Sequence, residues 1–325
     1  MKAKFMNEVH LEGLLYEHDL VLKVTGPTAK SPNTEFISGT VKIATDPELL
    51  NIVEVHYTYV TSKTARGDAN STFTNLRNII DEKVMTYMIH KGEDYKPTYV
   101  KVDTAIGLND FYMDRNGVRE LVTAKRNEGG FLHFIKESEL SPDMASRNRF
   151  QADMVITSIR RVEADEEKNL PEVMRVKGVV FDFRKAILPV EFVLYSPEGM
   201  DLFEDQVPSS TTPFCTNVRG SQISQTTKVR TTEASAFGPA IIKESPRTRK
   251  EHVIESIFDQ VSYVWDDDSF ITADDLRKAM GDREVYLAGV KKRDEEYQAS
   301  KANKSAATTT SAPASIQSQT GGFNF

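Results

Sequence analysis

One order of β-rich segments occurs twice along the chain. TNLR begins at Thr74 and TNVR at Thr216, and they follow a glycine, Gly39 or Gly178, by 35 and 38 positions. Each glycine opens a β-rich run, a turn and a second β-rich run. Self-similarity at so long a period indicates two copies of one domain, since a solenoid repeats every few dozen residues. A chain of 325 residues is long enough for two domains with separate cores.

Period-two alternation of apolar and polar residues predicts strands in both copies. The first copy has predicted strands near 7–24, 35–45, 50–62, 98–106 and 118–135, and a helix near 74–91. The second copy has predicted strands near 150–164, 173–184, 189–196, 227–233 and 239–243, with GSQISQ in place of the helix after TNVR. Five antiparallel strands with a helix between the third and fourth are the layout of the OB-fold, a small barrel that holds oligonucleotides or oligosaccharides.

The charge of −7 is distributed unevenly. From Arg219 to His252 there are seven Lys/Arg and three Asp/Glu, and from Val253 to Ala299 there are six and twelve. After Ala299 the chain is small and polar, and such a segment buries too little apolar area to offset the entropy of ordering it. We therefore expect a mainly β protein with two tandem OB-fold-like five-stranded barrels. The predicted boundaries are a first domain 1–145, a second domain 146–252, a short acidic helical segment 253–298 and a disordered tail 299–325.

The same composition bears on location and chemistry. Cys215 is the only cysteine, which excludes an intrachain disulfide and a multi-cysteine zinc site. Without a signal-peptide core or a long apolar run, a cytoplasmic protein with no membrane contact is expected. No motif for catalysis stands out, so neither an enzyme nor a cofactor is predicted. The acidic run WDDDSFITADDL departs from a calcium loop, and Thr272 is instead predicted to cap a short helix with Asp275 at its third position.

Three segments of the first copy resemble bacterial and phage single-stranded DNA-binding proteins. NEVHLEGLL is similar to their opening strand, TNLRNIIDEKVMTYMIHKGE to their helix, and DFYMDRNGVRELVTAKRNEGGFLHFI to their last hairpin. The resemblance spans residues 7 to 136 and is one of pattern. It implies sequence-independent binding of single-stranded DNA, in replication, recombination or repair.

Such binding needs cations that follow the phosphates and aromatic faces on which bases stack. Tyr57 and Tyr59 are two positions apart on one predicted strand, so they are expected to share a face, as platform or as core. The candidates in the first copy are Phe36, Lys42, Tyr57, Tyr59, Lys63, Arg66, Arg77, Lys101, Arg115, Arg119, Lys125 and Arg126. Those in the second copy are Phe181, Phe183, Arg184, Lys185, Tyr195, Arg219, Lys228 and Arg230. Asn75 and Asn217 are read as helix caps rather than base contacts.

The resemblance extends to the chain end, where related proteins recruit replication partners through a flexible acidic tail with an aromatic tip. Here Phe323 and Phe325 are the aromatic tip, and they are the predicted contacts for replication or recombination proteins. Two other classes of protein remain open. One is a structural or virion assembly protein built from tandem barrels, and the other is an OB module that binds carbohydrate or protein.

Overall fold

The computed structural model describes residues 1–325 except 3, 93, 166–169, 234–240 and 310–325, and gives only the course of the chain, without side chains, for a few further stretches. Its first set of elements is β1 (Asn7–His18), β2 (Val21–Val24), β3 (Glu35–Ala44), β4 (Ile52–Thr61), α1 (Ser71–Ile80), α2 (Tyr87–His90), β5 (Tyr99–Arg115) and β6 (Val118–Ile135). The second set is β7 (Asn148–Val162), β8 (Val173–Phe181), β9 (Ile187–Leu194), α3 (Pro197–Asp205), β10 (Phe214–Glu233) and β11 (Ile241–Tyr263). Two 3₁₀ turns, Glu137–Glu139 and Met144–Arg147, connect the sets, and α4 (Ala273–Thr309) follows them.

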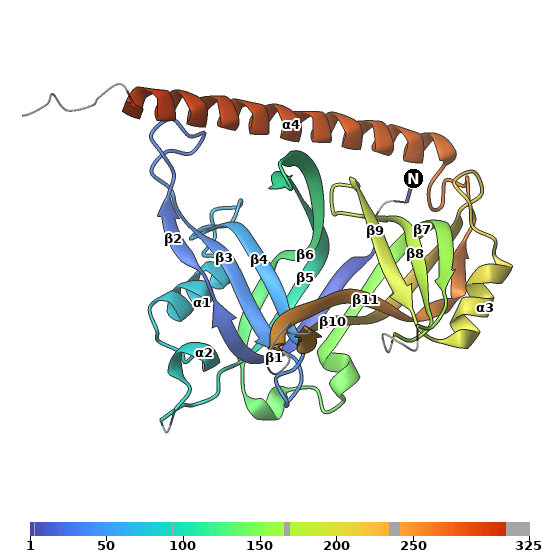
Figure 1. The fold of residues 1–325 in the computed structure, drawn as a ribbon, viewed down its shortest axis with the longest axis horizontal. Helices are drawn as coiled ribbons and strands as arrows, with labels where there is room; N and C mark the ends of the chain where they lie inside the picture. Colours follow the sequence, from blue (N-terminus) through green and yellow to red (C-terminus); the bar gives the residue numbers. More distant parts are fainter. Residues whose placement is uncertain (3, 93, 166–169, 234–240, 310–325) are drawn as a thin grey trace, which may run out of the picture. The chain divides into compact units, whose positions relative to one another are not determined.

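Both sets close into a barrel by the same order of strand pairing. In the first barrel β1 pairs antiparallel with β3 and β5, β3 pairs with β4, and β4 lies parallel to β6. In the second barrel β7 pairs with β8 and β10, β8 pairs with β9, and β9 lies parallel to β11. Between its third and fourth barrel strands, the first barrel carries α1 and α2 and the second carries α3. The prediction of a mainly β protein with two OB-fold-like five-stranded barrels is confirmed (Figure 1).

The two short motifs that suggested the repeat are not equivalent in the structure. TNLR lies inside α1, whereas TNVR lies in β10. The helix of the second barrel is α3, which comes before TNVR and was not predicted. Ser196 caps α3 by accepting a hydrogen bond from the Gly199 N–H at 3.2 Å, and Met200 and Phe203 are its buried positions.

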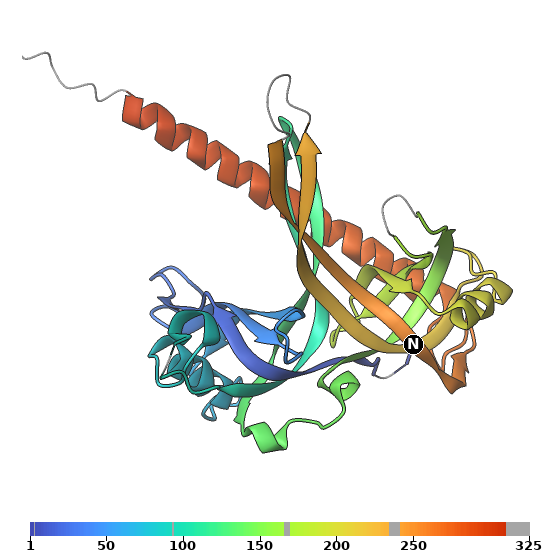
Figure 2. The same cartoon turned by 60° about the horizontal axis from the view of Figure 1, so that its bottom comes forward.

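The last two strands of the second barrel are much longer than predicted. β10 and β11 pair from Cys215 and Tyr263 out to Glu233 and Ile241, and Figure 2 shows them as a long twisted ribbon. Polar residues and two register shifts near Gly220 interrupt the apolar alternation on which the sequence prediction relied. β11 consequently continues past residue 252, the predicted end of the second domain. The predicted helix near 74–91 is likewise two helices, α1 and α2.

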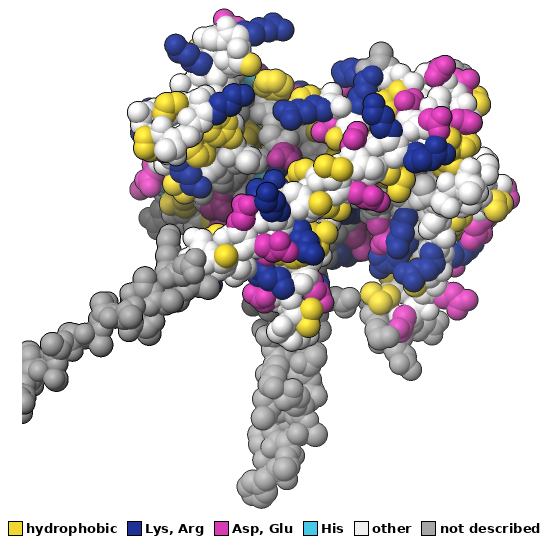
Figure 3. Space-filling view, turned by 90° about the horizontal axis from the view of Figure 1, so that it is seen from above, with side chains coloured by type: hydrophobic (Ala, Val, Ile, Leu, Met, Phe, Trp, Pro, Cys, Tyr) yellow, Lys and Arg dark blue, Asp and Glu magenta, His cyan; other side chains and the backbone are white. Residues whose placement is uncertain are grey.

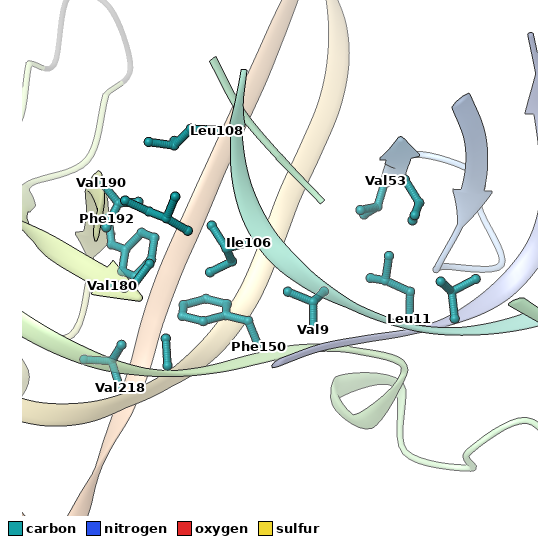
Figure 4. Packing of buried hydrophobic residues seen from close by; sticks show 14 of the residues in the cluster. Val9, Leu11, Val53, Ile106, Leu108, Phe150, Val180, Val190, Phe192 and Val218 are labelled. Carbon is teal, nitrogen blue, oxygen red and sulfur yellow. The ribbon is translucent and has the colours of Figure 1, made fainter. Parts of the chain in front are cut away.

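The two barrels share one eleven-stranded sheet and a hydrophobic cluster that spans them both. Asn7–Leu11 of β1 pairs antiparallel with Asn148–Ala152 of β7. Figure 4 shows the buried side chains passing from Leu11 through Val9 and Phe150 to Phe192. The expectation of separate cores is therefore wrong, because the opening strand of each barrel contributes side chains to a common interior.

Buried amides fasten the ribbon to this junction. The side chains of Asn127 on β6 and Gln222 on β10 exchange two hydrogen bonds, of 2.8 and 2.9 Å. The Gln222 backbone is satisfied by Asn148, and Asn51 donates to the Gln222 carbonyl at 3.0 Å. Because buried amides are stable only when they are paired, this arrangement fixes which residue of β10 lies against the first barrel.

A second compact unit contains the tip of the β5–β6 hairpin, Asp110–Thr123, and residues 282–325. In it the Arg283 guanidinium lies 2.7 Å from the Asp110 carboxylate. The predicted Thr272 cap is confirmed, since its hydroxyl accepts the Asp275 N–H at 3.1 Å. The helix that follows is long rather than short and reaches Thr309, eleven residues into the segment predicted to be disordered. No described helix is long and apolar enough to cross a membrane.

We predict that Gln222→Ala and Asn127→Ala each lower the free energy of unfolding by about 1–3 kcal/mol, because each leaves a buried amide without its partner. The double variant should lose less than the sum, since the two side chains satisfy each other. Urea unfolding of the four proteins measures this coupling. Additive losses would show that the amide pair does not stabilise the junction.

Candidate nucleic-acid interface

A bulge in β4 separates the two predicted stacking tyrosines. Ile37 of β3 pairs with Val60 and Gly39 pairs with Tyr57, so one residue of β3 opposes Thr58 and Tyr59 together. Tyr57 is a core residue, 2% exposed, and burial raises the pKa of its hydroxyl. Tyr59 is 49% exposed, with its ring centroid 4.7 Å from that of Phe36. The prediction that both tyrosines share one face is wrong, because the extra residue reverses the alternation.

An open groove lies between the outer face of β3 and β4 and the β10–β11 ribbon. It consists of two adjoining cavities of about 410 and 180 Å³ that share Glu54, Ser224 and Lys250, and we call it the inter-barrel groove. The larger cavity is also lined by Tyr16, Glu17, Lys42, Leu49, Leu50, Ile52, Thr226 and Thr248. The smaller is also lined by Val53, His56, Lys125, Arg126, Asn127, Gln222, Ile223, Glu251 and His252.

Two cations of this groove, Lys42 and Lys250, have carboxylate partners. Lys42 Nζ lies 2.6 Å from Glu17 Oε2, and this hydrogen bond raises the pKa of Lys42. Lys250 Nζ lies 2.6 Å from Glu54 Oε2, which ties the ribbon to β4. Figure 3 shows that Lys and Arg are interspersed with Asp and Glu over the displayed face. A phosphate would therefore have to replace carboxylates as the partner of these cations.

Lys125 occupies the deep end of the groove. Its ammonium donates to the Glu191 carbonyl and lies 5.4 Å from the Phe192 ring centroid. Desolvation lowers the pKa of Lys125 to about 8. Next to it, the buried His252 ring stacks on Phe192, and burial holds the pKa of His252 well below its ordinary value. No sequence pattern indicates His252 or Lys250, because their place depends on the register of the long ribbon.

The other predicted cations of the first barrel are spread around it. Lys63 and Arg66 are exposed in the β4–α1 loop. Arg77 Nε lies 2.8 Å from Asp81 on α1, and Lys101 Nζ lies 3.8 Å from Glu12. Arg126, by contrast, lines the inter-barrel groove and lies 2.7 Å from Glu128. None of the first four residues lines that groove, so the structure brings Lys42, Lys125 and Arg126 together and leaves these four outside it.

Arg115 and Arg119 belong to the second compact unit. Arg115 is exposed at the end of β5. The Arg119 guanidinium binds the Asp294 carboxylate of α4 through two nitrogens and lies 3.0 Å from Asp114. These contacts raise the pKa of Arg119. Arg119 is therefore engaged in holding α4 to the hairpin tip.

In the second barrel, the predicted stacking residue Phe181 belongs to the hydrophobic core. Phe181 is buried and stacks on Phe5 at a centroid distance of 3.9 Å, so its prediction as a stacking platform is wrong. Its burial follows from the N-terminal segment, which covers this side of β8. Phe183 is 88% exposed and has the Arg184 guanidinium 4.9 Å from its ring, and Lys185 lies in the same turn with a φ of 66°.

Arg219 lies away from the inter-barrel groove, in a different cavity of about 760 Å³ that is also lined by Arg149, Gln151 and Phe131. The side chains of Lys228 and Arg230 are outside the described part of the chain, and so are Phe323 and Phe325. The predicted cations of the second barrel with described side chains are therefore Arg184 and Lys185 in the β8–β9 turn and Arg219, and none of the three lines the inter-barrel groove.

The two asparagines predicted as helix caps have other structural roles. The cap of α1 is Asn70, whose side chain accepts the Thr72 N–H at 3.1 Å. Asn75 lies within the helix and donates to the Leu132 carbonyl at 2.8 Å. Asn217 lies on β10 and donates to the buried Asp153 carboxylate at 2.8 Å. Both side chains anchor their elements to a neighbouring strand.

No protein-family model and no curated protein sequence matches the chain. Among solved structures, the single-stranded DNA-binding protein of Thermus aquaticus is similar in a deletion mutant, with 9% identity, a TM-score of 0.45, and coverage of 81% of this chain and 98% of the other. The wild-type structure has 10% identity, a TM-score of 0.43, and coverage of 79% and 93%. The similarity is one of fold.

We predict opposite effects for two replacements of Tyr57. Tyr57→Phe should leave the melting temperature unchanged or raise it, because the buried hydroxyl has no hydrogen-bond partner among the described residues. Tyr57→Ala should lose about 3–5 kcal/mol of stability, as expected when a large buried aromatic side chain is removed. Thermal unfolding checks both. A stable Tyr57→Ala variant would show that this side chain is not part of the core.

A pH dependence follows from Lys125. Its pKa is about 8 in the folded protein, whereas an unfolded lysine titrates near 10.4. Between these values the unfolded state binds more protons, so the Lys125 contribution to the free energy of unfolding rises with pH. Relative to Lys125→Met, the wild-type protein should become more stable from pH 7.5 to 9.5. Urea unfolding at both pH values measures this, and a constant difference would contradict it.

Proposed function

We propose that this protein binds single-stranded DNA without reading its sequence, as a binding protein rather than an enzyme. The observation that carries the proposal is the inter-barrel groove. It follows the outer face of β3 and β4, the second and third strands of an OB barrel, which is the face that OB-folds use for oligonucleotides. It is lined by lysine, arginine and tyrosine, the residue types that contact phosphates and bases. The similar Thermus aquaticus structures are described as those of a single-stranded DNA-binding protein, which supports the proposal of single-stranded DNA binding.

The ion pairs of the groove are compatible with such binding. Lys42–Glu17 and Lys250–Glu54 are partly exposed pairs, and pairs of this kind contribute about 0–1 kcal/mol each. Exchanging a carboxylate for a phosphate therefore costs little. Phosphate contacts carry no sequence information, which suits binding that is independent of base order.

Within this proposal the protein acts in DNA replication, recombination or repair, in the manner of the bacterial and phage proteins that it resembles. The cytoplasm of a bacterial host is the matching location. The aromatic tip with Phe323 and Phe325 recruits replication or recombination proteins, which requires no contact between the tip and the groove.

We predict that the protein binds a fluorescent oligothymidine more tightly than duplex DNA of the same length. Affinity should fall as salt rises, because phosphate contacts release condensed counterions. Titrations at two salt concentrations, repeated with a second single-stranded sequence, measure strand preference, salt slope and sequence dependence. Equal affinity for duplex, or no binding at low salt, would contradict the proposed function.

Two variants locate the contacts in the same assay. Tyr59→Ala removes an exposed ring beside Phe36 and should weaken binding by about 1–3 kcal/mol if a base stacks there. Tyr297→Ala removes another exposed tyrosine, on α4, and serves as the control, with unchanged affinity. A loss of affinity in the control alone would place the binding surface on α4.

A further inference from the structure

A second β-bulge contains a tyrosine that sequence reasoning missed. Leu15 of β1 pairs with Ile43, and Glu17 pairs with the next residue, Lys42. Tyr16 is therefore the extra residue of a bulge, opposed by no residue of β3. Bulges redirect side chains and are over-represented beside functional sites. Here Tyr16, which follows the buried Leu15, faces outward by regular alternation, and the bulge turns Glu17 outward as well, so both line the larger cavity of the inter-barrel groove.

The Tyr16 ring is supported by an aromatic contact with α2. It stacks on Tyr87 of α2 with centroids 5.5 Å apart and planes at 24°, and Tyr95 packs edge-on against Tyr87 at 5.6 Å. A ring stacked on a neighbour that a third ring holds in place has little freedom left to lose when a ligand arrives, and preorganisation of this kind strengthens binding. Tyr16 therefore has the properties of a rigid platform.

The remaining walls of the cavity combine apolar and cationic groups. Leu50, 61% exposed, is displayed at the rim by a turn in which the Asp46 carboxylate accepts the N–H groups of Leu50 and Asn51 at 2.9 and 2.7 Å. Lys42 comes from the first barrel and Lys250 from the ribbon. The volume of about 410 Å³ is within the range of small-ligand sites.

We propose that this cavity holds one unstacked base of a bound DNA strand, with the base on Tyr16 and against Leu50 and the adjoining phosphates at Lys42 and Lys250. The inference rests on the proposed function and adds to it a defined base subsite to which both barrels contribute. An apolar rim beside a braced aromatic ring favours a planar base over a phosphate alone, and two cations in the same cavity favour a base that remains attached to its backbone.

The test separates base from backbone. Tyr16→Leu keeps an apolar side chain but removes the aromatic face, and Tyr16→Phe is the matched control that keeps it. Affinity is measured for oligothymidine and for an abasic deoxyribose-phosphate oligomer of equal length. Tyr16→Leu should weaken oligothymidine binding by about 5- to 150-fold, the range for one stacked base, and leave abasic binding unchanged. Tyr16→Phe should bind both like the wild type.

A fluorescent variant keeps the inference testable if Tyr16→Leu fails to fold. Tyr16→Trp in a Trp265→Phe background introduces one indole at the cavity, which oligothymidine should quench and the abasic oligomer should not. Wild-type affinity for oligothymidine in folded Tyr16→Leu, or quenching by both oligomers alike, would overturn this inference alone. Absence of oligothymidine binding by the wild-type protein would overturn the proposed function as well, so the two failures are distinguishable.

Discussion

β1 and β7, the opening strands of the two barrels, pair with each other over Asn7–Leu11 and Asn148–Ala152. Each of these strands also pairs with two strands of its own barrel. The hydrogen bonds of the sheet therefore link every barrel strand to this contact. Phe150 and Val9 then pack into a common core. Since the register of this pairing sets which faces of the barrels are turned toward each other, the inter-barrel groove exists as a consequence of the β1–β7 contact.

Two small irregularities determine which side chains of β1 and β4 face outward. Without the bulge at Thr58 and Tyr59, the ring of Tyr59 would follow Tyr57 into the core. Without the bulge at Tyr16, Glu17 would be turned inward and could not pair with Lys42. In both places one extra residue converts a position of regular alternation into an outward side chain. The outward positions of Tyr59 and Glu17 are thus products of local backbone geometry, whereas Tyr16, which follows the buried Leu15, faces outward by the regular alternation of β1.

Regular strand alternation could be predicted from the sequence, whereas bulges and contacts between distant segments could not. Alternation placed most strands of the first barrel, because each strand has one face in the core and one outside. It could not reveal a bulge, which left Tyr57 and Tyr59 on the same predicted face. Phe181 was misassigned because residues far away in sequence, Phe5 and Phe270, cover it. Lys250 was not predicted because the strands of the ribbon that carries it are rich in polar residues and lack apolar alternation.

Electrostatics determine how such a groove would work. The chain carries a net charge of −7, which repels a polyanion. At physiological ionic strength, salt screens this repulsion at separations beyond about 8 Å. Long-range attraction is therefore weak, and affinity has to arise at contact. At that range Lys42 and Lys250 exchange Glu17 and Glu54 for phosphates at little cost, while stacking adds a term that depends on the base and hardly on salt. A groove of partnered cations with braced aromatics suits a protein that holds a strand already separated from its complement.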